Sequence, residues 1–116
     1  MINNYIVIFY LHVVIRNMLI HTVLFWLKQN QSEKNRESFL DEVKKLGEIA
    51  SVDDFHVGSP AATPKRPVVV DNYDFAITVV LKDMKAHDDY QADPIHLGFI
   101  EKCKDMWEKV VIYDAD

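Results

Sequence analysis

The stretch that decides the fold is Leu19–Lys28, with the sequence LIHTVLFWLK. Its aliphatic and aromatic residues predict a β-strand. Successive residues of a strand point to opposite faces, and both sets are apolar here. One set contains Ile20, Leu24 and Trp26, and the other contains Val23, Phe25 and Leu27. A strand that is apolar on both sides belongs to a sheet that is covered on both sides.

The rest of the chain predicts two helical segments and three further strands. Ser32 and Glu33 are typical of a helix start, and an apolar stripe of helical period follows for about 16 to 18 residues. Pro60, Pro64 and Pro67 predict a loop between Gly58 and Asn72. The remaining predicted elements are strands at Val52–Gly58, Tyr73–Leu81 and Lys109–Asp114, a short helix at Lys85–Gln91, and a long helix from Asp93–Pro94 to about Trp107.

This element order is β-α-β-β-α-β with the second helix split in two, which is the ferredoxin-like α+β pattern. Both helices would pack on one face of the sheet. The other face would then lie open, although the first strand is apolar there as well. A symmetric homodimer that closes two sheets into an α+β barrel would cover it, and we predict that assembly.

Composition and charge exclude some classes of function. The chain has 116 residues and a formal net charge of -5, which suits one domain and argues against a nucleic-acid partner. The pair Lys65–Arg66 is flanked by prolines and is expected to be a solvated loop. Cys103 is the single cysteine, so no intrachain disulfide forms. It is expected to act as a small core residue rather than a nucleophile, in a cytoplasmic protein.

Residues 1–17 form an apolar leader. The run Tyr5–Ile15 is shorter than the roughly 20 residues that a membrane-spanning helix needs, and it lacks the features of a signal peptide. We predict that residues 18–116 are the self-contained domain. The leader is then either an upstream extension or a segment with a structural or membrane role, and membrane association is not expected.

A candidate site emerges from the histidines. His96 shares helical spacing with Phe99, Ile100, Cys103 and Trp107, so its ring should face the core, as should one face of the strand that carries His21. A buried polar ring needs either a partner or a function. Histidine titrates near neutral pH, which makes His96 the first candidate for a general base.

The surrounding residues complete this hypothesis. His21 would orient the ligand or His96, and Tyr90 would donate a hydrogen bond to a developing oxyanion. The apolar walls of the pocket would be Phe25, Phe75, Phe99 and Trp107. In the structural alternative, the histidines bond backbone carbonyls and the tyrosine and the other aromatic residues only pack.

Metal binding is the weaker interpretation of these residues. His21, His96 and Asp93 could together bind zinc or iron. Asp93 is better explained as the cap of the long helix, and no compact ligand motif is present. We therefore predict neither a metal nor a cofactor, and we treat His12, His56 and His87 as incidental.

Four stretches of the chain resemble the stress-responsive α/β-barrel family, whose modules are called Dabb domains. They are IHTVLFWLK (20–28), YDFAITVVLKD (73–83), DYQADPIHLGF (89–99) and MWEKVVIYD (106–114). The resemblance implies a ferredoxin-like fold and a dimeric barrel. Members of the family are mostly small proteins without a settled activity, among them plant stress proteins and a polyketide cyclase.

The catalytic pattern of that cyclase is matched only in part. Its strand histidine, helix histidine and tyrosine correspond to His21, His96 and Tyr90. Two other polar positions of its pocket correspond to Phe75 and Val43, which puts the same reaction in doubt.

Two functions follow as hypotheses. The first is a small-molecule site that binds an aromatic or polyketide-like compound, or acts on it by acid–base chemistry. The second is a non-catalytic dimer with a structural or stress-protective role. A haem- or oxygen-handling relative of the same barrel is a third and weaker candidate. A hollow of several hundred cubic ångströms beside His96 would favour the first hypothesis, and a solid core there would favour the second.

Overall fold

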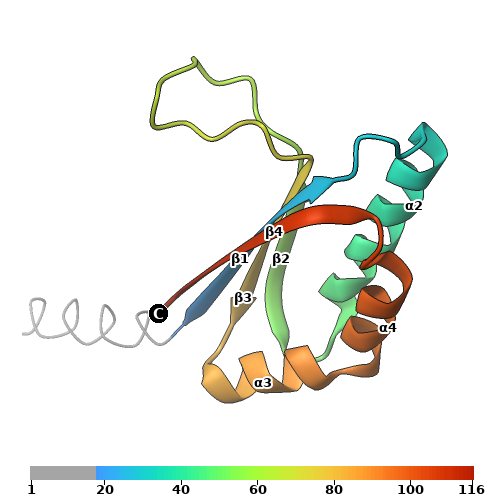
Figure 1. Cartoon of the computed structure of the whole chain (residues 1–116). Coiled ribbons are helices and arrows are strands. Elements are labelled where there is room, and N and C mark those ends of the chain that lie inside the picture. The colour runs from blue at the N-terminus through green and yellow to red at the C-terminus, as the bar shows by residue number, and fades with distance from the viewer. Residues whose placement is uncertain (1–17) are drawn as a thin grey trace, which may run out of the picture.

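The computed structural model describes residues 18–116, which form a four-stranded sheet with helices packed on one face (Figure 1). In chain order the elements are β1 (Leu19–Leu27), α2 (Glu33–Lys44), the 3₁₀ helix η1 (Lys45–Glu48), β2 (Val52–Gly58), β3 (Phe75–Leu81), α3 (Met84–Ala92), α4 (Pro94–Cys103) and β4 (Trp107–Ala115). The predicted ferredoxin-like order with a split second helix is confirmed.

The sheet has the strand order β2-β3-β1-β4, and every neighbouring pair is antiparallel. The decisive strand β1 therefore lies inside the sheet. Its central residue Val23 pairs with Ile77 of β3 on one side and with Ile112 of β4 on the other. This register places residues from both ends of the chain next to each other.

Side-chain caps begin the helices where the sequence predicts. The Ser32 hydroxyl accepts a hydrogen bond from the Asn35 amide at 3.1 Å, and Asp93 accepts one from the Ile95 amide at 2.8 Å. Pro94 occupies the first turn of α4, where its missing N–H is not needed. Each cap satisfies an amide that has no partner within the helix.

The end of α4 differs from the prediction. The helix stops at Cys103, a tight turn follows with the Met106 amide donating to the Cys103 carbonyl at 2.9 Å, and Trp107 begins β4. The predicted helix was too long because Trp107 packs against the core, as a helical residue at that spacing would, although it lies in a strand. The first helix is also shorter than predicted, because it tightens into η1 after Lys44.

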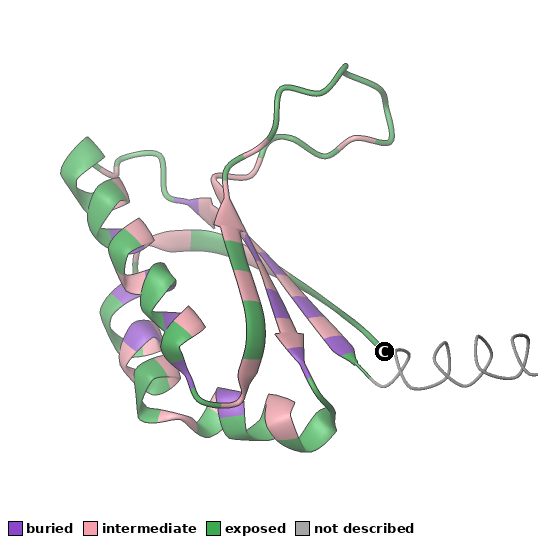
Figure 2. Cartoon of the chain, turned by 180° about the vertical axis from the view of Figure 1, so that it is seen from behind, coloured by how far each residue is buried: buried purple, intermediate pink, exposed green. Residues whose placement is uncertain are grey.

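The core lies between the sheet and the helices. Odd-numbered residues of β1 face the helices and are buried, whereas even-numbered residues of β1 are half-buried on the other face (Figure 2). Phe25, Phe39, Phe99 and Trp107 form an aromatic cluster there, with Phe25 centred 5.2 to 5.9 Å from the other three rings. Tilted and edge-on pairs at this spacing add to the stabilisation from burial alone.

No helix within residues 18–116 has both the length and the apolar character required to cross a bilayer. The predictions for the leader, and for His12 within it, concern residues 1–17 and fall outside the part of the chain that is described.

Candidate functional site

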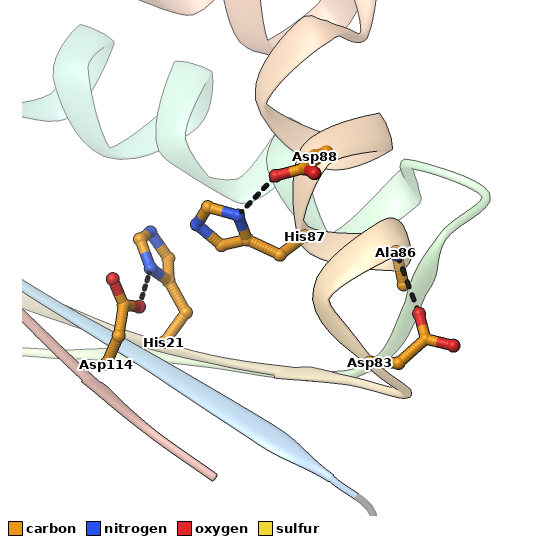
Figure 3. A network of polar contacts seen from close by, with 6 residues as sticks. All are labelled: His21, Asp83, Ala86, His87, Asp88 and Asp114. Carbon is orange, nitrogen blue, oxygen red and sulfur yellow. Dashed lines mark hydrogen bonds and ion pairs between the residues drawn. The ribbon is translucent and has the colours of Figure 1, made fainter.

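His21 is the buried polar residue of the core, with 2% of its surface exposed. It lies on β1 directly opposite Asp114 of β4, and its Nδ1 lies 2.5 Å from Asp114 Oδ1 (Figure 3). An ionised carboxylate can only accept, so Nδ1 carries the proton and donates it to this bond. The bond orients the ring, and Nε2 is the nitrogen that the carboxylate does not contact.

Helix α3 brings two further residues to the same point. The ring centroids of His87 and Tyr90 lie 5.4 and 5.7 Å from that of His21, both in edge-on geometry. They are three residues apart in the helix and therefore project from the same face. His87 was predicted to be incidental, and the fold places it beside the buried histidine.

His96 lies in the first turn of α4, and its ring centroid is 4.9 Å from that of Tyr90. The side chain is half-buried, so it faces inward as predicted. Its Nδ1 is buried and lacks a well-formed hydrogen bond within residues 18–116, although the backbone of Gln91 lies close enough to act on the ring as a weak hydrogen-bond partner. Burial and the nearby His21 lower the pKa of His96, while the backbone of Gln91 acts in the opposite direction. His96 is therefore neutral at physiological pH.

Tyr90 packs against the rings of both His21 and His96, and 1% of its surface is exposed. Burial raises the pKa of its hydroxyl well above the usual value near 10. The phenol therefore stays protonated at every physiological pH. A protonated phenol can donate a hydrogen bond but cannot serve as a base at neutral pH.

A cavity of about 100 Å³ lies beside the two histidines. Its lining includes His21 and His96 together with Phe25, Phe99 and Trp107, five of the seven residues predicted for the site. The volume is below the several hundred cubic ångströms of an ordinary ligand pocket. A hollow therefore exists, but it encloses only a few heavy atoms.

The other two predicted residues lie elsewhere. Phe75 stacks on Phe39 of α2 with ring centroids 5.7 Å apart, and it is not part of the cavity wall. Tyr90 lies next to both histidines without lining the cavity. Val43, the second apolar replacement noted in the sequence, is fully buried in α2. The cavity wall therefore contains only part of the predicted pocket lining.

The structure also brings in residues that the sequence did not single out. Asp114 and His87 surround His21, while Gln91 and Ile112 contribute to the cavity wall. Asp114 shares the parity of Val110 and Ile112 in the closing strand, which places it on the helix side of the sheet. The parity of Asp114 identifies it as the partner of His21 only once the β1–β4 register is known.

The thiol of Cys103 is buried at the end of α4, where burial raises its pKa to about 11. The thiolate is the nucleophilic form, so this residue is unsuited to covalent catalysis at neutral pH. Its position confirms the prediction that it acts as a small core residue.

A family model, the stress responsive A/B barrel domain or Dabb, matches residues 19–116. No curated protein matches this chain by sequence. Among solved structures, a Dabb family protein with a ferredoxin-like fold from Mesorhizobium loti is 28% identical, with a TM-score of 0.68 over 85% of this chain and 95% of that one.

Two other structures show the same fold at lower identity. A dimeric ferredoxin-like protein of unknown function from Thermobifida fusca is 20% identical, with a TM-score of 0.69 over 84% of this chain and 89% of that one. The hydroxynitrile lyase from Passiflora edulis is 18% identical, with a TM-score of 0.72 over 86% of this chain and 93% of that one. One fold thus carries both an enzyme and proteins without an assigned function.

Proposed function

This chain belongs to the stress responsive A/B barrel domain family, and from that premise we propose that it is a homodimer with a small acid–base site at His21 and His96. One observation carries the catalytic part of the proposal. Two histidines line one cavity, and one of them has a buried ring nitrogen that lacks a well-formed hydrogen bond within residues 18–116. A polar group left in this state suits a ligand that supplies the missing hydrogen bond.

The roles follow from the surroundings of each ring. His96 is neutral and lines the cavity, so it can take a proton from a carbon acid or a hydroxyl and return it. His21 is held by Asp114 and orients the ligand. Tyr90 packs behind both rings and outside the cavity wall, so we assign it a positioning role in place of direct oxyanion contact.

The size of the cavity limits the substrate. About 100 Å³ is smaller than a 150 Å³ cavity that holds benzene, so only a small group can be fully enclosed. We propose a small carbonyl or aromatic compound whose reactive end enters between the histidines. The rest of a larger molecule would extend past Ile112, which is 51% exposed at the edge of the sheet.

A thermal-shift screen of small aromatic acids and carbonyl compounds tests this proposal, because selective binding stabilises the native state. A hit should lose its stabilising effect in His96→Gln and keep it in Glu101→Gln, a control on an exposed residue of the same helix. Hits are then assayed for conversion. A hit that stabilises His96→Gln as well as the wild type would contradict the site.

The small volume favours one further candidate function, a non-catalytic dimer with a structural or stress-protective role. The two functions differ in the screen. A structural dimer would give no hit at all.

The dimer is proposed from the outer face of the sheet. Ile20, Leu24 and Trp26 are half-buried there, and no helix of the described chain covers them. Solved relatives from Thermobifida fusca and Jannaschia are described as dimeric. A second copy placed on this face would bury the apolar residues and complete a barrel. A cytoplasmic location remains part of the proposal.

Light scattering measures the assembly directly. We expect a mass of about twice 13.5 kDa for the wild type and a shift toward the monomer for Leu24→Glu, because an unpaired charge is costly to bury. Leu97→Glu is the matched control, because Leu97 is 56% exposed on α4. A wild-type protein that stays monomeric at high concentration would contradict the dimer.

A further inference from the structure

The cluster around His21 contains the ligand types of a transition-metal site. His21, His87 and Asp114 each offer one ligand atom, and these three atoms lie within 4.8 Å of one another. The residues come from β1, α3 and β4, so the tertiary fold brings them together (Figure 3). Two imidazoles and a carboxylate form a common ligand set for zinc and related divalent ions.

The hydrogen bonds around the cluster resemble the outer shell of a metal site. His87 Nδ1 lies 3.2 Å from Asp88 Oδ1, and Figure 3 shows the opposite side of the His87 ring turned toward His21. A carboxylate partner on Nδ1 leaves Nε2 as the ring nitrogen that can bind a metal ion. Metal-bound histidines in proteins usually have a carboxylate or carbonyl partner of this kind on the second nitrogen.

From this geometry we propose that His21, His87 and Asp114 bind a divalent transition-metal ion of the zinc class. The inference goes beyond the proposed acid–base function and does not depend on it. Zinc takes nitrogen and oxygen ligands at about 2.0 to 2.2 Å, which places tetrahedral ligand atoms about 3.3 Å apart. The three groups must therefore rearrange on binding, and the hydrogen bond between His21 Nδ1 and Asp114 gives way to bonds with the ion. Asp114 has freedom to do so, because its side chain is 44% exposed.

Such an ion would lie next to the cavity, because His21 contributes to both. Three protein ligands leave a four-coordinate zinc ion one further position for water or a ligand atom. A bound ion would also occupy one ring nitrogen of His21. A bound ion would then change any activity of the cavity. His87 would be the ligand that serves the ion without lining the cavity.

The test uses the full chain without an affinity tag, dialysed against a chelator. Zn²⁺ is titrated by calorimetry, and Co²⁺ is followed by its visible absorption. We expect one ion per chain. His87→Ala should weaken binding by at least about 10-fold, and Asp88→Asn, which changes only the outer shell, should weaken it by about 10-fold. His56→Ala, an exposed histidine of β2, should leave the affinity unchanged.

Two results would overturn the inference: no Zn²⁺ or Co²⁺ binding by the folded wild-type chain, or binding that His87→Ala and Asp88→Asn leave unchanged. Circular dichroism checks that both variants fold, and Asp88 is exposed, so its replacement leaves the core intact. This test is separate from that of the acid–base site. The His87→Ala variant tests only the metal site, and the His96→Gln variant tests only small-molecule binding at the acid–base site.

Discussion

Asp74 is expected to be a disproportionately important residue for stability, because one carboxylate joins three elements. Its Oδ2 accepts the backbone amide of Leu27 at 2.7 Å, at the end of β1. Its Oδ1 accepts Arg36 Nη2 of α2, also at 2.7 Å. The residue itself directly precedes β3, and its own amide donates to the Phe25 carbonyl. Removing the carboxylate therefore affects the sheet and a helix together.

The magnitude can be worked out from the two bonds. Asp74→Ala leaves the amide of Leu27, a residue 3% exposed, without its acceptor, which costs about 1 to 3 kcal/mol. The pair with Arg36 is partly exposed on both sides and contributes at most about 1 kcal/mol. We expect a total loss of about 1 to 4 kcal/mol. Arg36→Ala should cost about 1 kcal/mol or less, and Asp74→Asn should fall between the two because its amide oxygen can still accept from Leu27.

Urea denaturation followed by far-UV circular dichroism measures these differences. All variants must be compared at one protein concentration, because dimerisation makes apparent stability concentration-dependent. The order of the losses is the critical result. If Asp74→Ala costs no more than Arg36→Ala, the backbone bond contributes little and the reasoning is refuted. A changed denaturant slope would instead show that the unfolding transition itself differs.

Three other predictions concern helix positions, a thiol and pH. Gly98→Ala in α4 should raise the free energy of unfolding by about 0.5 to 1 kcal/mol, because a Cβ there meets nothing within 4 Å and alanine favours helix. Gly47→Ala should lower the free energy of unfolding by about 1 to 3 kcal/mol, because the new Cβ would lie 2.9 Å from Phe55 Cδ1. Urea melts in which the two glycine variants have equal effects would contradict both predictions. Cys103 should resist thiol reagents at pH 8 until the chain unfolds, and fast labelling of the native protein would show that its burial is wrong. The pKa of His96 is lower in the folded chain than its usual value of 6.5, so the unfolded chain binds a proton at this residue more readily. The contribution of His96 to the free energy of unfolding is therefore complete above pH 6.5, and it is lost as the pH falls toward the pKa of the folded chain. Between pH 7.5 and 5.5, in metal-free buffer, the wild type should therefore lose more stability in urea melts than His96→Gln, and parallel losses would argue against the shift.

The sequence was sufficient to predict the fold because its local signals agree. The two-sided apolar strand at Leu19–Lys28, the capping residues Ser32 and Asp93, and the proline-rich loop all point to the same β-α-β-β-α-β order. The main error was the end of the last helix, which was predicted near Trp107 and lies at Cys103. An apolar residue at helical spacing can reach the core from a following strand as well as from the helix, and spacing alone does not distinguish the two cases.

The sequence by itself determined the order of elements and the inward turn of His96, because periodicity and caps act over a few residues. Both faces of the strand that carries His21 are apolar, so the tertiary structure decided which of them meets the helices. Only the tertiary structure decided which polar groups meet. Asp114 reaches His21 across 93 positions of the chain, and His87 reaches it from α3. Those contacts depend on the register of β4 against β1 and on the docking of α3, both of which are long-range properties that no local pattern encodes.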